Sequence, residues 1–118
     1  MILVPLVDDG VFRSRHTSVT SLIDTNISLE QAAVVREVGD ADALKVENDF
    51  PVPKLGAGQV IVKNEFAGIN FIDTYHRKGM YARDLPFIGG QEGGGTVAAV
   101  SDEAAAQGIK VGDRVAYS

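Results

Sequence analysis

The side chains with the clearest capacity for chemistry lie between positions 68 and 81. Asn70 carries an amide that both donates and accepts hydrogen bonds, and Tyr75 and Tyr81 carry flat apolar faces with polar tips. Such faces suit a planar ligand. Each residue also has a structural reading, because an asparagine after glycine can satisfy its own turn and the tyrosines can lie on an ordinary amphipathic surface. Taken singly, these residues leave both readings open.

Two further polar residues of this run are given structural readings. Asp73 reads as a helix-start carboxylate rather than a general base. His76 follows Tyr75 in the sequence, and we expect it to be exposed and without a role.

A glycine-rich stretch over residues 93–98 matches the residue pattern of the dinucleotide-binding fingerprint, with Ala98 in its last position. That fingerprint requires a hydrophobic strand before it, a helix after it and an acidic residue about 20 positions further on. Here residues 97–100 favour a strand. We therefore expect these glycines to let two backbones pass closely at a bend, and we reject the nucleotide-loop interpretation.

The elements that must position these residues are mostly strands. Alternating or continuous apolar runs predict strands over residues 33–38, 43–47, 59–67, 94–100 and 113–117. A short helix or turn is predicted over 71–77 and ends at Gly79, and one helical turn over 102–107 ends at Gly108. Pro51 and Pro53 mark a connection. Short strands, tight turns and little helix indicate a small, irregular β-barrel.

Residues 1–30 differ from the rest of the chain. They show no clear strand alternation, and only Val19, Leu22, Ile23 and Ile27 approach a helical period. We expect an N-terminal extension that is loosely ordered or packed on the barrel, with the barrel domain over residues 31–118.

Composition excludes several classes of function. The chain has 118 residues and a formal charge of −5, scattered along its length, which gives no basic surface for nucleic acid or anionic lipid. It contains no cysteine, so disulfides and thiolate zinc sites are excluded. No apolar run approaches the roughly 20 residues that span a bilayer. We expect a cytoplasmic protein that binds neither nucleic acid nor membrane.

Residues 32–118 resemble the start of the catalytic domain of the medium-chain dehydrogenases and reductases, in the quinone oxidoreductase (zeta-crystallin-like) branch. The resemblance implies a mainly β fold, a partly open GroES-like barrel (alcohol dehydrogenase-like N-terminal domain) with short helices. We expect the chain to end before the Rossmann domain of that family. The matching blocks occur in the family's order, at 59–63, 67–75, 79–81, 85–95 and 111–115.

The chain departs from the zinc-dependent alcohol dehydrogenases that it also resembles. Those enzymes carry a zinc-ligating cysteine where this chain has Asn70, and a zinc-ligating histidine where it has Gln91. An amide is a poor substitute for either ligand. The resemblance therefore implies a zinc-independent reductase, in which Glu92 is a structural carboxylate.

The resemblance also implies roles for three residues. Asn70 and Tyr75 are expected to lie at the cofactor, NADPH, and Tyr75 and Tyr81 to line the pocket for a quinone or enone. The cofactor side of the site belongs to a second domain in this family, so we expect the isolated chain to bind no cofactor tightly and to be inactive. An alternative is a stand-alone barrel that acts as an interaction or assembly module, with homo-oligomers formed through strand edges at 94–100 and 113–117. A co-chaperonin role is disfavoured by the run from Asn70 to Tyr75.

Overall fold

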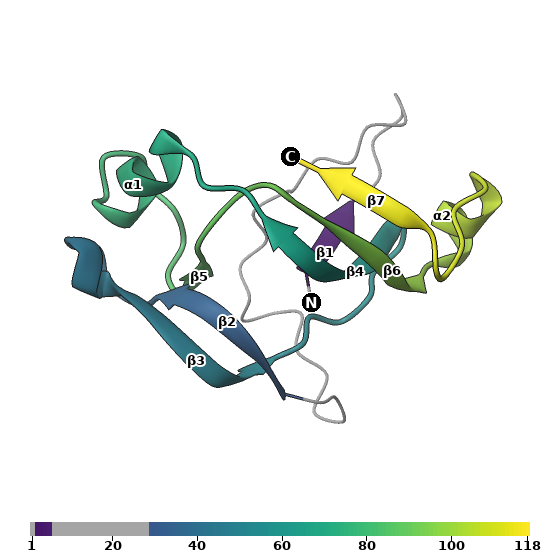
Figure 1. Ribbon diagram of the computed structural model, residues 1–118, viewed down its shortest axis with the longest axis horizontal. Coiled ribbons are helices and arrows are strands. Elements are labelled where there is room, and N and C mark those ends of the chain that lie inside the picture. The colour runs from purple at the N-terminus through teal and green to yellow at the C-terminus, as the bar shows by residue number, and fades with distance from the viewer. Residues whose placement is uncertain (1, 6–28) are drawn as a thin grey trace. The chain divides into compact units, whose positions relative to one another are not determined.

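The computed structural model describes residues 2–5 and 29–118, with side chains described from residue 31 onward. The contacts within the chain define two compact units. Among the described residues, unit 1 holds residues 2–5, Pro53–Gly68 and Glu92–Ser118, and unit 2 holds residues 29–52 and Ile69–Gln91. The elements, in chain order, are β1 (Ile2–Pro5), β2 (Leu29–Val35), the 3₁₀ turn η2 (Ala41–Ala43), β3 (Leu44–Pro51), β4 (Gln59–Ala67), α1 (Phe71–Arg77), β5 (Phe87–Ile88), β6 (Gly93–Val100), α2 (Asp102–Ala106) and β7 (Arg114–Tyr117) (Figure 1).

Unit 1 is built on a four-stranded antiparallel sheet in the order β1-β4-β6-β7. The strong apolar run of β4 places Val60 and Val62 in its core, where both are fully buried together with Val97 of β6. Tyr117 of β7 and Ala104 of α2 complete this cluster. Burying such aliphatic side chains supplies about 1.5–3 kcal/mol each, so β4 is the main stabilising strand of unit 1.

The glycine-rich stretch forms the start of β6, and a strand follows it rather than a helix. Gly95 lies opposite Asn64 in β4, and a Cβ atom at Gly95 would overlap the carbonyl oxygen of Lys63. Glycine is therefore required there by the close approach of two strands. A strand at this position agrees with the expectation that the stretch is not a nucleotide-binding loop.

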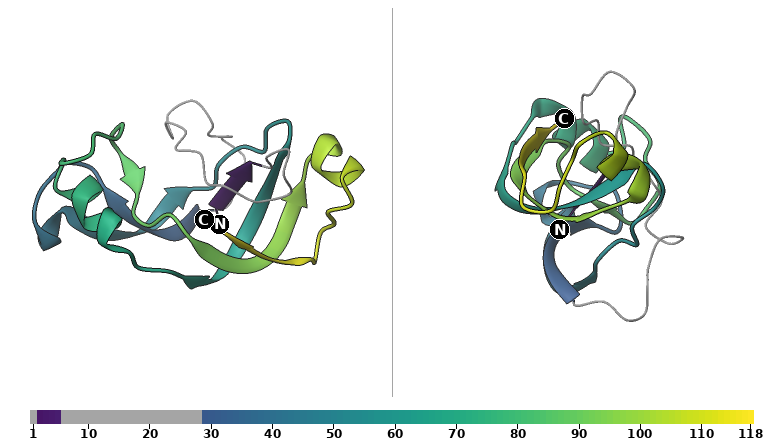
Figure 2. Two further views of the ribbon diagram at one scale, coloured as in Figure 1. Left: turned by 90° about the horizontal axis from the view of Figure 1, so that it is seen from above. Right: turned by 90° about the vertical axis from the view of Figure 1, so that its right-hand side faces the viewer.

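The short helix α2 is fixed to unit 1 by its N-cap. The Ser101 hydroxyl accepts hydrogen bonds from the backbone N–H of Ala104 at 3.3 Å and of Gln59 at 3.2 Å. Figures 1 and 2 show α2 at the end of unit 1 where β6 finishes and β7 begins. Gly108, with φ of +94°, ends the helical segment as predicted.

Unit 2 is built on a three-stranded antiparallel sheet in the order β3-β2-β5. Val34 and Val35 of β2 are fully buried, and Phe50 of β3 and Phe87 of β5 are also buried. Helix α1 is joined to the loop after β2 because the N–H of Gly39 donates to the carbonyl of Arg77 at 2.9 Å. This bond holds the C-terminal end of α1 within the unit.

The mainly β fold with short helices is confirmed, and the strands form two small sheets that are not closed into a barrel. The predictions for 59–67 and 71–77 match β4 and α1. Strand β2 ends at Val35 rather than at 38, and β1 and β5 were not predicted. The helical pattern from Val19 to Ile27 lies outside the described residues, and the boundary after residue 30 stays a prediction.

The strand-edge prediction was partly wrong. Strand β6 pairs with β4 on one side and, over Gly93–Thr96, with β7 on the other, so residues 94–96 form no edge. Among the described strands, β7 is an outer strand. Within the described ranges, no helix is long and apolar enough to cross a membrane.

Candidate functional site

Gly68 follows β4 and precedes the segment that carries the candidate site residues. Its N–H donates to the carbonyl of Glu92 at 3.1 Å, and a Cβ atom at Gly68 would overlap the Glu92 side chain. Both residues belong to unit 1. The Glu92 side chain therefore packs against Gly68, and this contact requires a glycine at position 68.

Helix α1 begins after its N-cap Asn70, which is joined to Asp73 in the first turn by two hydrogen bonds. The Asn70 N–H donates to Asp73 Oδ2 at 2.8 Å, and the Asp73 N–H donates to the Asn70 carbonyl at 3.1 Å. A carboxylate in the first turn also interacts favourably with the positive end of the helix dipole. Asp73 is thus a helix-start carboxylate, as expected, and it holds the backbone of Asn70 in place.

Helix α1 ends in a Schellman motif, which turns the chain back along the helix. The N–H of Gly79 donates to the carbonyl of His76 at 3.0 Å, and the N–H of Met80 donates to the carbonyl of Tyr75 at 2.9 Å. Gly79 has φ of +76°, the left-handed conformation that this motif requires. The reversal brings Tyr81 back toward Tyr75.

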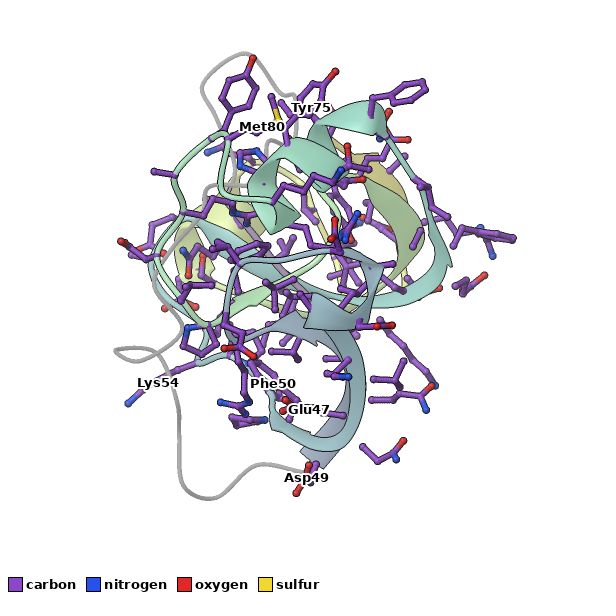
Figure 3. The ribbon with its side chains drawn as sticks, turned by 90° about the vertical axis from the view of Figure 1, so that its left-hand side faces the viewer. Glu47, Asp49, Phe50, Lys54, Tyr75 and Met80 are labelled. Atoms are coloured by element: carbon purple, nitrogen blue, oxygen red, sulfur yellow. The ribbon has the colours of Figure 1, made fainter. Side chains whose placement is uncertain are left out.

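Tyr75 and Tyr81 form an edge-to-face pair. Their ring centroids lie 5.6 Å apart and their planes meet at 83°, the geometry that aromatic quadrupoles favour. The side chains are 37% and 53% exposed, so both rings keep a face open to solvent. Figure 3 shows Tyr75 on α1 and Met80 just after it, and Glu47 and Phe50 on β3 of the same unit.

His76 is the residue for which the sequence expectation was wrong. Its side chain is buried, with only 9% of its surface exposed. Nδ1 lies 3.3 Å from the carbonyl oxygen of Tyr81, and the imidazole meets the Tyr81 ring at a centroid distance of 6.0 Å. The chain reversal at Gly79 covers His76, which a short polar run in the sequence does not reveal.

Large apolar side chains are exposed to solvent on both sides of α1 in the sequence. Ile69 and Phe71 are 93% and 84% exposed, and Met80 beyond Gly79 is also exposed. Exposed large side chains of this kind, close together in the chain, are typical of a surface that contacts a ligand or another protein domain. They flank Asn70 and the tyrosine pair within unit 2.

Oδ1 of Asp73 and Nε2 of Gln91, both in unit 2, are buried without a hydrogen-bond partner among the described residues. Nearby, Arg83 lies over the Phe87 ring at 4.4 Å; burial lowers the pKa of its guanidinium, and the charge of Asp73 acts against that shift. Oδ1 of Asp73, in the first turn of α1, can accept a further hydrogen bond.

The structure places Asn70, Tyr75 and Tyr81 in one unit, and it brings the two tyrosines into contact. Asn70 lies at the opposite end of α1 from the point where the tyrosine rings meet. Exposed aromatic faces suit contact with a planar ligand, and an amide can donate and accept hydrogen bonds. Across the described part of the chain, no cluster of three or more His, Cys, Asp or Glu residues could hold a metal ion.

Comparison with known proteins gives the class of the chain. The family model for the alcohol dehydrogenase GroES-like domain matches residues 56–118. The chain belongs to this family. The curated relatives that it matches include quinone oxidoreductases, the branch that the resemblance implied.

Curated relatives in that branch are similar over most of the chain. A probable quinone oxidoreductase from Schizosaccharomyces pombe is 45% identical over 70% of this chain and 25% of its own length. The quinone oxidoreductase of Homo sapiens is 39% identical over 77% of this chain and 28% of its own length. The chain therefore spans about a quarter of the length of these relatives, so the activity of a whole protein is a matter for proposal.

Two mycobacterial structures have a similar fold. One, a protein complexed with NADPH, has a TM-score of 0.68 at 46% identity and covers 73% of this chain and 26% of its own. The other, a quinone oxidoreductase, has the same TM-score at 45% identity. These likenesses confirm the predicted GroES-like fold class.

Proposed function

We propose that this chain is the substrate-side domain of a zinc-independent, NADPH-dependent quinone oxidoreductase. The observation that carries the proposal is the exposed edge-to-face pair of Tyr75 and Tyr81, held by the Schellman end of a helix whose N-cap is Asn70. Relatives named as quinone oxidoreductases and a neighbour solved with NADPH support it.

When bound, NADPH would supply the hydride that a quinone or enone accepts. The task of the chain's own residues is then to place the planar acceptor and to exclude water from it. Tyr81 and the open face of Tyr75 offer apolar contact to the acceptor ring, and their hydroxyls offer hydrogen bonds to its oxygens. Asn70 and Tyr75 would hold the nicotinamide edge, with Asn70 fixed through the Asp73 carboxylate.

Zinc independence is the second part of the proposal. Asn70 and Gln91 stand where zinc-dependent relatives in this superfamily carry a cysteine and a histidine. A neutral amide oxygen is a weak zinc ligand compared with thiolate or imidazole. Activity that survives exhaustive treatment with a strong zinc chelator is the expected result.

A chimera provides the test. Residues 1–118 would replace the corresponding segment of the mycobacterial quinone oxidoreductase to which the chain is 45% identical. The chimera should oxidise NADPH in the presence of a quinone, and the isolated chain should show neither turnover nor tight NADPH binding by calorimetry. A folded chimera that binds NADPH but reduces no quinone would contradict the proposal.

The assembly module remains the second candidate. Strand β7 is an outer strand of the unit 1 sheet, and outer strands present unpaired backbone groups that other chains can extend. Light scattering of the isolated chain over a wide concentration range tests this candidate. A mass that stays at that of a monomer would count against assembly through this strand.

A further inference from the structure

His76 stands out because, tyrosine aside, it is the one residue with a polar or charged side chain that is buried as a whole among residues 31–118. Burying an imidazole is unfavourable unless its polar atoms find partners. The sequence reading gave it no role, and the proposed chemistry of Asn70, Tyr75 and Tyr81 does not use it. His76 lies in the last turn of α1, and the chain that reverses at Gly79 brings Tyr81 into contact with it.

The backbone of Tyr81 is a partner of His76. Nδ1 lies 3.3 Å from the Tyr81 carbonyl oxygen, which can only accept a hydrogen bond. Nδ1 must therefore carry a proton in this contact, which sets the tautomer of a neutral ring. The Tyr81 N–H donates in turn to the Tyr75 carbonyl at 3.4 Å. Both backbone groups of Tyr81 are thus held by the last turn of α1.

The ring of His76 also packs against the ring of Tyr81. The two planes meet at 63° with a centroid separation of 6.0 Å, while Tyr81 meets Tyr75 at 83° and 5.6 Å. The Tyr81 ring therefore contacts the buried His76 imidazole and the exposed Tyr75 ring. Tyr81 itself is 53% exposed.

We propose that His76 is a positioning residue that fixes Tyr81 for contact with the planar acceptor. This inference rests on the proposed function, and it adds a residue that acts through Tyr81 and does not touch the substrate. Loss of the Nδ1–H donor should free the segment after Gly79 and weaken acceptor binding, while the cofactor side stays unchanged.

The kinetic test uses three variants in the chimera. His76→Phe keeps an aromatic ring but removes the donor, and we expect KM for the quinone to rise about 3- to 10-fold, the factor that one ordinary hydrogen bond supplies. His76→Asn places an amide N–H near the position of Nδ1 and should restore KM to within about 2-fold. Tyr81→Ala should abolish the difference between histidine and phenylalanine at position 76, because the residue that His76 positions is gone.

A merely structural His76 would lower stability without this pattern. Equal quinone KM for the wild-type chimera and His76→Phe, or an undiminished effect of His76→Phe in the Tyr81→Ala background, would overturn the inference. An inactive wild-type chimera would instead count against the proposed function.

A spectroscopic test is independent of activity. In the ¹⁵N-labelled 118-residue chain, the ring-nitrogen shifts of neutral His76 should show the proton on Nδ1, whereas an exposed imidazole such as one in a short peptide carries it mainly on Nε2. A His76 ring with an unprotonated Nδ1 would overturn the inference whatever the chimera does.

Discussion

At the scale of single residues, Gly79 determines where the two tyrosines meet. Its φ of +76° lies in a region that costs a residue with a side chain about 1–2 kcal/mol. A Cβ atom at Gly79 would also lie 3.2 Å from Cγ1 of Val38, closer than ordinary contact. The reversal after α1 therefore depends on glycine for both conformation and space.

We predict that Gly79→Ala lowers the free energy of unfolding of the isolated chain by about 1–3 kcal/mol, as measured by urea denaturation. Gly108→Ala is the matched control, since Gly108 has φ of +94° but no atom lies within 4 Å of the point that its Cβ would occupy. The loss at Gly79 should exceed the loss at Gly108. Equal losses would show that the contact with Val38 contributes nothing.

The residues of the site differ in how far the sequence predicts them. Gly79 and the helix-start role of Asp73 follow from local rules, because glycine ends helices and carboxylates begin them. The burial of His76 does not follow from such rules. A helix of seven residues is too short for its period to mark an inner face, and the cover over His76 comes from the chain after Gly79.

At the scale of elements, a bulge in β4 presents Glu65 to side chains of β6 and β7. The register shifts between Asn64 and Phe66, so Glu65 has no opposing residue in β6. Its Oε1 accepts a hydrogen bond from the Thr96 hydroxyl at 2.8 Å, and its Oε2 lies 3.1 Å from a guanidinium nitrogen of Arg114 in β7. The hydrogen bond from Thr96, followed by the charge of Arg114, lowers the pKa of Glu65.

A lowered pKa in the folded chain means that the ionised Glu65 stabilises the fold above the pKa of an unfolded glutamate. That contribution is lost as the pH falls through the folded value. We predict that Glu65→Gln flattens the acid side of the stability curve, with a smaller difference in urea midpoint between about pH 7 and about pH 3 than the wild-type chain shows. Glu37→Gln is the control, a glutamate on the loop after β2 for which no such contact is described. The same pH dependence in Glu65→Gln and wild type would contradict the contact.

The elements that the sequence predicts best are those whose own residues determine them. Strand β4 carries a continuous apolar run, and α1 and α2 each end at a glycine with positive φ. Strand β5 is two residues long and exists because Phe87 and Ile88 pair with Val35 and Val34 of β2. Such a strand has no period of its own, so the sequence around it cannot reveal it.

At the scale of the whole molecule, the chain carries a family fold, and we propose that it supplies one side of a site. The comparisons cover about three quarters of this chain but about a quarter of each relative. Family membership could be predicted from blocks of sequence spread over residues 59–115. The division of the chain into two compact units could not, because each unit joins segments that are distant in the sequence.

The central claim is that this chain supplies the acceptor side of the site, and the quinone KM of the chimera carrying Tyr81→Ala tests it most directly. Val46→Ala, which alters an exposed apolar residue on β3 of the same unit, is the control. We predict that Tyr81→Ala raises KM for the quinone about 3- to 10-fold, the range of one aromatic contact, and leaves KM for NADPH unchanged. Val46→Ala should change neither constant. A Tyr81→Ala chimera with unchanged quinone KM, or with a change confined to NADPH, would contradict the account.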